Sequence, residues 1–245
     1  ALQSPSLLTL TWAIVCLFQA TGWTKPAHDH VRAPALSLLM PIAGEWALNA
    51  SYIVDTISGA SPQYHASNLT KMSDHREAVS GSLTRYFPNS FYTAGVARST
   101  ESDYESNTAF VQANFLSEEK NTTITVGFGG ANDTIIGSEI GRRSKDVIDA
   151  VLGVTQVLST VDIVQATYRK SSGQGFFSDQ YKAFDSRPDN RDIDSVLFRW
   201  NHHFLQADGT TRLTYRYYQD SFDIRSHTIG MEYVQRMPYG FTLMP

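Results

Sequence analysis

Apolar and polar side chains alternate with a period of two residues in one segment of this chain after another. Within residues 211–220, for example, Leu213 and Tyr215 share one face, and Arg212 and Thr214 share the other. Such alternation is typical of a β-strand with one apolar and one polar face, because successive side chains point to opposite sides. The pattern predicts about 12 strands, which cover residues 33–42, 46–55, 78–87, 91–99, 108–116, 122–129, 147–158, 161–169, 196–204, 211–220, 226–237 and the beginning of 240–244.

The length of these segments favours a membrane protein. Most are near the length of about 9–11 residues that a tilted strand needs to cross a bilayer, whereas strands of soluble proteins commonly have about 5–6 residues. Short turns, such as residues 88–89, alternate with longer expected loops at 100–107, 130–145 and 170–192, as in outer-membrane barrels. The sequence therefore predicts an all-β fold, an antiparallel up-and-down transmembrane β-barrel in the bacterial outer membrane.

Composition excludes two other classes of protein. The chain is 42% hydrophobic and has no series of apolar runs of about 20 residues, so it is not a bundle of transmembrane helices. Its 20 basic and 24 acidic residues give a net charge of −4, which provides no basic field to attract nucleic acid. Aromatic residues make up 12% of the chain and suit girdles at the two bilayer interfaces.

The amino-terminal residues do not follow the strand pattern. Residues 7–20 form an apolar stretch of signal-peptide length, but no Lys or Arg precedes it, since the first is Lys25. We expect residues 1–30 to be an N-terminal segment, either a signal-peptide remnant or an unmatched leader, and residues 31–245 to be the barrel domain. An expected descending first strand and an end within a strand predict a barrel that is incomplete at both ends.

Several stretches together resemble one family. They are residues 33–36 with 41–42, 52–62, 101–106, 177–182 with 187–191, 202–204, and 215–218 through 224–228. From about Val31 to its end the chain is similar to the bacterial domain-of-unknown-function family 3570, which is grouped with outer-membrane β-barrels. The resemblance implies the fold and the outer-membrane location, but it implies no activity.

Charged residues on the polar faces are the best-founded candidates for a functional role. We expect a set of them to face the lumen, where they would either line a charged pore or pair across the lumen and plug it. The set is Asp55, Arg199, Arg212, Arg216, Glu232 and Arg236.

Metal and catalytic motifs are weak. Glu101, Asp103 and Glu105 alternate through an expected loop and are candidates for a cation site, since Ca²⁺ prefers carboxylate oxygens, but a solvated acidic loop is the favoured interpretation. His28 and His30 could chelate a metal on a strand, although an exposed polar loop is favoured there. No Gly-x-Ser-x-Gly elbow is present. We expect no enzyme activity, cofactor or metal.

Three functions remain open from the sequence. The first is a pore or transporter component of the outer membrane, with the lipid bilayer as its surroundings. The second is a non-conducting barrel that scaffolds a periplasmic or extracellular partner through the 170–192 loop, whose aromatic and Arg residues suit a contact surface. The third is a soluble secreted β-protein that binds a small ligand.

Overall fold

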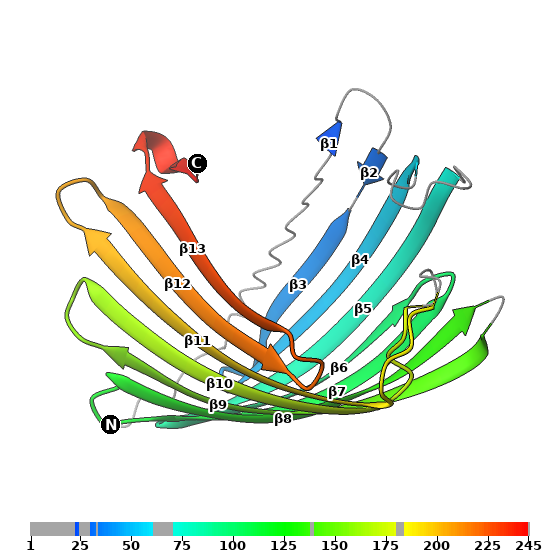
Figure 1. Cartoon of the computed structure of the whole chain (residues 1–245). Helices are drawn as coiled ribbons and strands as arrows, with labels where there is room; N and C mark the ends of the chain where they lie inside the picture. Colours follow the sequence, from blue (N-terminus) through cyan, green and yellow to red (C-terminus); the bar gives the residue numbers. More distant parts are fainter. Residues whose placement is uncertain are drawn as a thin grey trace.

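The computed structural model describes residues 23–24, 30–32, 34–60, 71–137, 140–179 and 184–244. They form one antiparallel 14-stranded sheet, which curves into an open trough (Figure 1). Its strands are β1 (Trp23–Thr24), β2 (His30–Arg32), β3 (Ala35–Ile42), β4 (Trp46–Ala60), β5 (Lys71–Phe87), β6 (Ser90–Thr100), β7 (Tyr104–Leu116), β8 (Thr122–Gly137), β9 (Gly141–Val157), β10 (Asp162–Gly175), β11 (Asn190–Phe204), β12 (Gly209–Asp220), β13 (Arg225–Arg236) and β14 (Thr242–Leu243). A short 3-10 turn, η2 (Pro238–Gly240), lies between β13 and β14.

The pairing is that of an up-and-down meander. From β4 to β14 each strand pairs with the next along the chain, while both β3 and β2 pair with β4. Strands β3 to β14 lie on the segments that the alternation predicts, so the predicted all-β antiparallel fold is confirmed. No helix within the described ranges is long and apolar enough to cross a membrane.

The expected long loops are shorter than predicted. β7 begins at Tyr104, and β8 runs to Gly137 before β9 begins at Gly141. Most of residues 100–107 and 130–145 are therefore strand, and the prediction of loops there is wrong. The alternation fades because most residues of these strand ends are small or polar on both faces, and because the adjacent Ile135 and Ile136 lie on opposite faces.

The register sorts the strands into two faces. Paired residues share a face, so Leu213 lies with Trp200 and Met231, and Arg212 lies on the opposite face with Glu232. One face carries a continuous apolar belt across the sheet. The belt includes Leu48, Ala50, Leu83, Ala94, Val96, Val111, Val126, Phe128, Ile148, Leu152, Val154, Ala166, Phe198, Trp200, Leu213, Tyr215, Ile229 and Met231.

The belt lies on the convex side of the trough. Its side chains splay outward and are exposed, such as Ile229 at 81% and Ile148 at 69%, whereas the polar Asn114 and Ser171 on the other face are only 3% and 4% exposed. Side chains crowd together on a concave surface, so this difference identifies the polar face as the inner one. An apolar surface of this extent on the outside of a protein is suited to contact lipid.

Aromatic residues border the belt. Along the short-turn end, the rings of Phe87 and Tyr92 and of Tyr92 and Phe115 have centroids 5.7 and 6.1 Å apart, and Trp46, Trp200, Phe204 and Tyr233 continue this border. Tyr52, Tyr168 and Tyr217 border the belt at the other end. Two such borders are the aromatic girdles of a membrane barrel.

Above the second girdle the convex face becomes polar. Arg98 and Glu105 form an ion pair of 2.8 Å there, and Lys170 and Asp194 form another of 3.0 Å. The carboxylate of Asp194 also accepts a hydrogen bond from the hydroxyl of Tyr168. We call this band the polar collar, and it marks where the strands leave the bilayer.

The predicted division at residue 31 falls at the edge of the sheet. Residues 1–22 and 25–29 lie outside the described residues, and so does His28 of the histidine pair. β1 pairs with β2, and β2 pairs with β4 at Thr56–Ser58. The assignment of residues 1–30 as a signal-peptide remnant or leader therefore stays a prediction.

Candidate functional site

The six charged residues expected at a lumen all lie on the polar, concave face. Asp55 faces Arg76 at 4.0 Å, and Arg212 forms an ion pair of 2.8 Å with Glu232 on the next strand. Arg236 is two positions beyond Val234 on the same face of β13. The remaining two, Arg199 and Arg216, are on β11 and β12. That this face lines a lumen stays a prediction.

Arg199 and Arg216 differ from the other arginines because no carboxylate is paired with either within the described ranges. Nη1 of Arg199 donates to the side-chain oxygen of Gln165 at 3.3 Å, and its Nε is buried without a hydrogen-bond partner. Nη2 of Arg216 has a long contact of 3.5 Å with the hydroxyl of Thr228. Both guanidinium groups therefore keep donors that these contacts do not use.

Other cations on this face are neutralised by acids on neighbouring strands. Arg169 of β10 binds Asp149 of β9 with two hydrogen bonds of 2.8 and 3.0 Å. Lys145 of β9 lies 3.2 Å from the buried Asp133 of β8 and 5.3 Å from the ring centre of Tyr104. Burial and the hydrogen bond to Asp133 raise the pKa of Tyr104, which stays neutral and can donate to that carboxylate.

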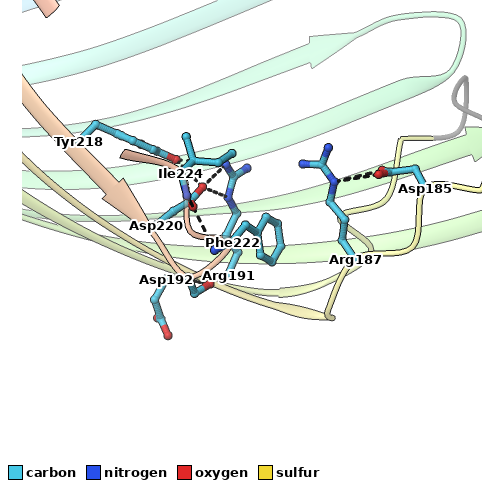
Figure 2. Close-up of polar contacts among 9 residues, drawn as sticks. Asp185, Arg187, Arg191, Asp192, Tyr218, Asp220, Phe222 and Ile224 are labelled. Carbon is cyan, nitrogen blue, oxygen red and sulfur yellow. Dashed lines mark hydrogen bonds and ion pairs between the residues drawn. The ribbon is translucent and has the colours of Figure 1, made fainter. Parts of the chain in front are cut away.

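A second cluster lies at the long-loop end of the trough, around Asp220 at the end of β12. Figure 2 shows Arg191, Tyr218 and Asp220 on the inner side of the sheet, whereas Asp192 points the other way. Nε and Nη2 of Arg191 donate to the Asp220 carboxylate at 3.1 and 2.5 Å, and the hydroxyl of Tyr218 donates to it at 3.0 Å. These contacts join β11 to β12.

The same carboxylate also holds the turn between β12 and β13. It accepts the backbone N–H groups of Phe222 and Ile224, both at 3.0 Å. Burial alone would raise the pKa of Asp220, but the hydrogen bonds from Arg191, Ile224, Tyr218 and Phe222 hold it below its usual value. Asp220 therefore stays ionised and organises the turn.

The segment that connects β10 to β11 packs against this cluster. The ring of Phe177 meets the ring of Phe222 edge to face at 6.0 Å. Arg187 lies 5.7 Å from the centre of the Phe222 ring and binds Asp185 at 3.1 Å (Figure 2). Part of the 170–192 loop that the sequence suggests as a partner surface is thus engaged within the protein; Tyr181 lies outside the described residues.

On β4 to β7 the polar face has small side chains. Ser51, Ser80, Ala97 and Ser106 leave a hollow of about 520 Å³, beside which Arg76 lies. This part of the trough is therefore open, in contrast to the region around Asp220, which Phe177 and Arg187 partly cover.

The three carboxylates proposed for a cation site do not come together. Glu101 follows β6 on the polar face, 3.5 Å from Arg76, whereas Glu105 pairs with Arg98 on the convex side. In the part of the chain that the structure describes, no three His, Cys, Asp or Glu side chains are grouped so as to hold a metal. Alternate positions on a strand share a face, but the turn at residues 101–103 interrupts that rule here.

The convex apolar belt, its aromatic girdles and the meander of strands together define a bacterial outer-membrane β-barrel protein. Residues 65–140 and 137–245 match the family described as "Protein of unknown function (DUF3570)", so the match extends over well more than half of the chain. The chain belongs to this family, as its sequence resemblance implies. Among curated proteins no match is found.

Solved structures with a similar arrangement are outer-membrane proteins. The toluene transporter TodX of Pseudomonas putida superposes with a TM-score of 0.50 at 9% identity, over 86% of this chain and 78% of TodX. A loop-deletion mutant of OmpT, an outer membrane protein of Vibrio cholerae, gives a TM-score of 0.49 at 9% identity, over 86% of this chain and 93% of OmpT. The siderophore receptor PirA of Pseudomonas aeruginosa gives 0.46 at 12% identity, over 88% of this chain but only 40% of PirA. Identities this low relate folds, not functions.

The membrane assignment removes the third function considered from the sequence. A soluble secreted protein would expose the whole convex belt to water, including side chains as large as Phe128 at 58% and Met231 at 69% exposure. Lipid contact accounts for this surface, so the soluble alternative is set aside.

Proposed function

We propose that the chain forms the wall of a passive pore or transporter of the outer membrane. The observation that carries the proposal is the continuous separation of the two faces, with an apolar convex belt and a concave face rich in charged and small polar residues. A polar inner wall keeps water and polar solutes in favourable surroundings, whereas a plugged scaffold has no need of an open hollow beside Arg76.

Reconstitution of the full-length protein into planar bilayers tests this proposal. We expect discrete conductance steps, and bilayers that receive the same detergent without protein serve as the control. The absence of conductance steps at every applied voltage would remove the pore function.

One observation favours a second function, a non-conducting barrel that scaffolds a protein partner. Phe184, in the connection between β10 and β11, is fully exposed and has a positive φ of 64°. Exposed aromatic residues are common anchors of protein interfaces, and a non-glycine residue at positive φ costs free energy that a bound partner could offset.

A pull-down from outer membranes distinguishes the scaffold from the pore. Phe184→Ser should lose the partner, whereas Ile224→Ser, which alters an exposed apolar residue in a neighbouring turn, should keep it. Equal recovery of co-purified proteins with the Phe184 variant and the unaltered protein would count against the scaffold.

A further inference from the structure

Three arginines surround one point of the polar face. Thr214 of β12 is paired with Arg199 on β11 and with Gly230 on β13. Arg212 and Arg216 lie two positions before and after Thr214, on the same face. Diagonal neighbours in an antiparallel pair lie about 7–8 Å apart, a distance that long arginine side chains can span.

The charge of this patch is not balanced. Glu232 forms an ion pair with Arg212. Among the described residues of the polar face that are paired with the three arginines or with Thr214, Glu232 is the one acid. The other residues of this group are uncharged, namely Gln165, Leu197, Asn201, Thr228 and Gly230. Three positive charges against one negative charge leave a local excess of two. The excess resides on Arg199 and Arg216, which have no carboxylate partner in this region.

The centre of the patch carries only small groups. Gly230 contributes no side chain, and the hydroxyl of Thr214 lies over it, where it donates to the carbonyl of Gly230. The long side chains of Arg199, Arg212 and Arg216 therefore surround a centre made of a threonine and a glycine. The buried Nε of Arg199, without a partner, adds a donor whose hydrogen bond is unmade, and such a group is costly to leave unsatisfied.

We infer that Arg199 and Arg216, with Thr214 between them, form a binding site for a small oxyanion, that is, a solute carrying carboxylate or phosphate oxygens. Guanidinium groups bind such oxygens with two parallel hydrogen bonds. The inference rests on the proposed pore function only for its role as a selectivity site; binding itself does not require conduction.

Equilibrium binding to the detergent-solubilised full-length protein, measured by isothermal titration calorimetry, tests the site directly. Inorganic phosphate and succinate are titrated separately, so that the two oxyanion classes are distinguished. We expect at least one of them to bind, and its affinity to fall at least tenfold in the double variant Arg199→Gln and Arg216→Gln.

The matched control is the double variant Arg98→Gln and Arg142→Gln. It removes the same charge from the convex face, where Arg98 and Arg142 lie with Asn107 and Ile136, and its affinity should stay within a factor of two of the unaltered protein. Binding of neither anion, or equal losses in both double variants, would overturn the inference.

Reversal potentials in a tenfold KCl gradient separate this inference from the pore proposal. The unaltered protein should favour chloride, and the Arg199 and Arg216 double variant should shift toward potassium while still conducting. A conducting variant with unchanged selectivity and unchanged binding would contradict the anion site and leave the pore intact. A protein that never conducts but binds phosphate or succinate through Arg199 and Arg216 would contradict the pore and leave the anion site intact.

Discussion

Arg191 and Asp220 are 29 positions apart in sequence and form an ion pair in which the Asp220 side chain is completely covered. Five hydrogen bonds from Arg191, Tyr218, Phe222 and Ile224 converge on this carboxylate. One side chain thereby fixes the end of β11, the end of β12 and the turn that follows it.

Removing this carboxylate should destabilise the long-loop end of the sheet. We expect Asp220→Asn to lower the free energy of unfolding by about 1–3 kcal/mol, because it leaves the buried donors of Arg191 and the turn without a charged acceptor. Urea unfolding of the protein in lipid vesicles, followed by tryptophan fluorescence, measures the change. Asp192→Asn is the control, since that side chain points to the other side (Figure 2); equal losses in both variants would contradict the role of Asp220.

The order of the β12–β13 turn should depend on pH only in the acid range. The pKa of Asp220 is held below its usual value, so its contribution is complete above the unfolded pKa of about 3.9 and is lost as the pH falls through the lower folded pKa. Hydrogen-exchange protection factors of the Phe222 and Ile224 amides should be constant from about pH 5 to 8 and fall in stronger acid. In Asp220→Asn they should be low and independent of pH, and a loss of protection near neutral pH in the unaltered protein would refute the assignment.

Two adjacent positions on β7 test which face meets lipid. Val111 lies in the belt and Gln112 on the polar face. We expect Val111→Arg to reduce the unfolding free energy in vesicles by about 2–4 kcal/mol, the cost of an arginine at the bilayer midplane. Gln112→Arg should cost clearly less, since Gln112 is paired on the polar face with the small residues Thr93 and Gly127. A larger loss for Gln112→Arg would reverse the assignment of the two faces.

A substitution of Gly173 tests whether the ring of Phe177 packs on the sheet. A Cβ on Gly173 would come within 2.7 Å of the Phe177 ring, so Gly173→Ala should push the ring away and expose the β10–β11 connection. We expect faster cleavage of this connection in limited proteolysis of Gly173→Ala than of the unaltered protein. Adding Gly173→Ala to a Phe177→Ala background should change the cleavage rate little, and a full effect of Gly173→Ala in that background would show that the two residues are not coupled.

Much of the fold could be predicted because a bilayer imposes alternation on every strand that crosses it. On β11, Phe198 is suited to lipid and its neighbour Arg199 to water, and the same holds for Leu213 and Arg212 on β12. The order of such neighbours in the sequence already separates the two faces. The strand ends could not be predicted in the same way. Residues 130–137 and 141–145 are mostly small or polar, and the adjacent Ile135 and Ile136 lie on opposite faces, so no alternation distinguishes these segments from a loop.

The interactions within the trough were harder to predict than the strands. The alternation places Arg199, Arg212 and Arg216 on one face. It does not indicate which of them has an acid beside it, because that depends on how β12 is paired with the strand that carries Glu232. No sequence pattern indicates the contacts of Arg191 and Phe177, since their partners Asp220 and Phe222 lie far along the chain. The only local indication was an Asp at the end of a strand, a position where its oxygens can accept backbone N–H groups of the following turn.

The meander also determines how this sheet can assemble. Between β4 and β14 every described pairing joins strands that follow one another in the chain, so each new strand closes only a short segment and loses little chain entropy. Contacts of such low sequence separation form quickly, and a hairpin already in place provides a template for the next strand. Folding of this region can therefore proceed by successive addition of single strands, without first bringing distant parts of the chain together.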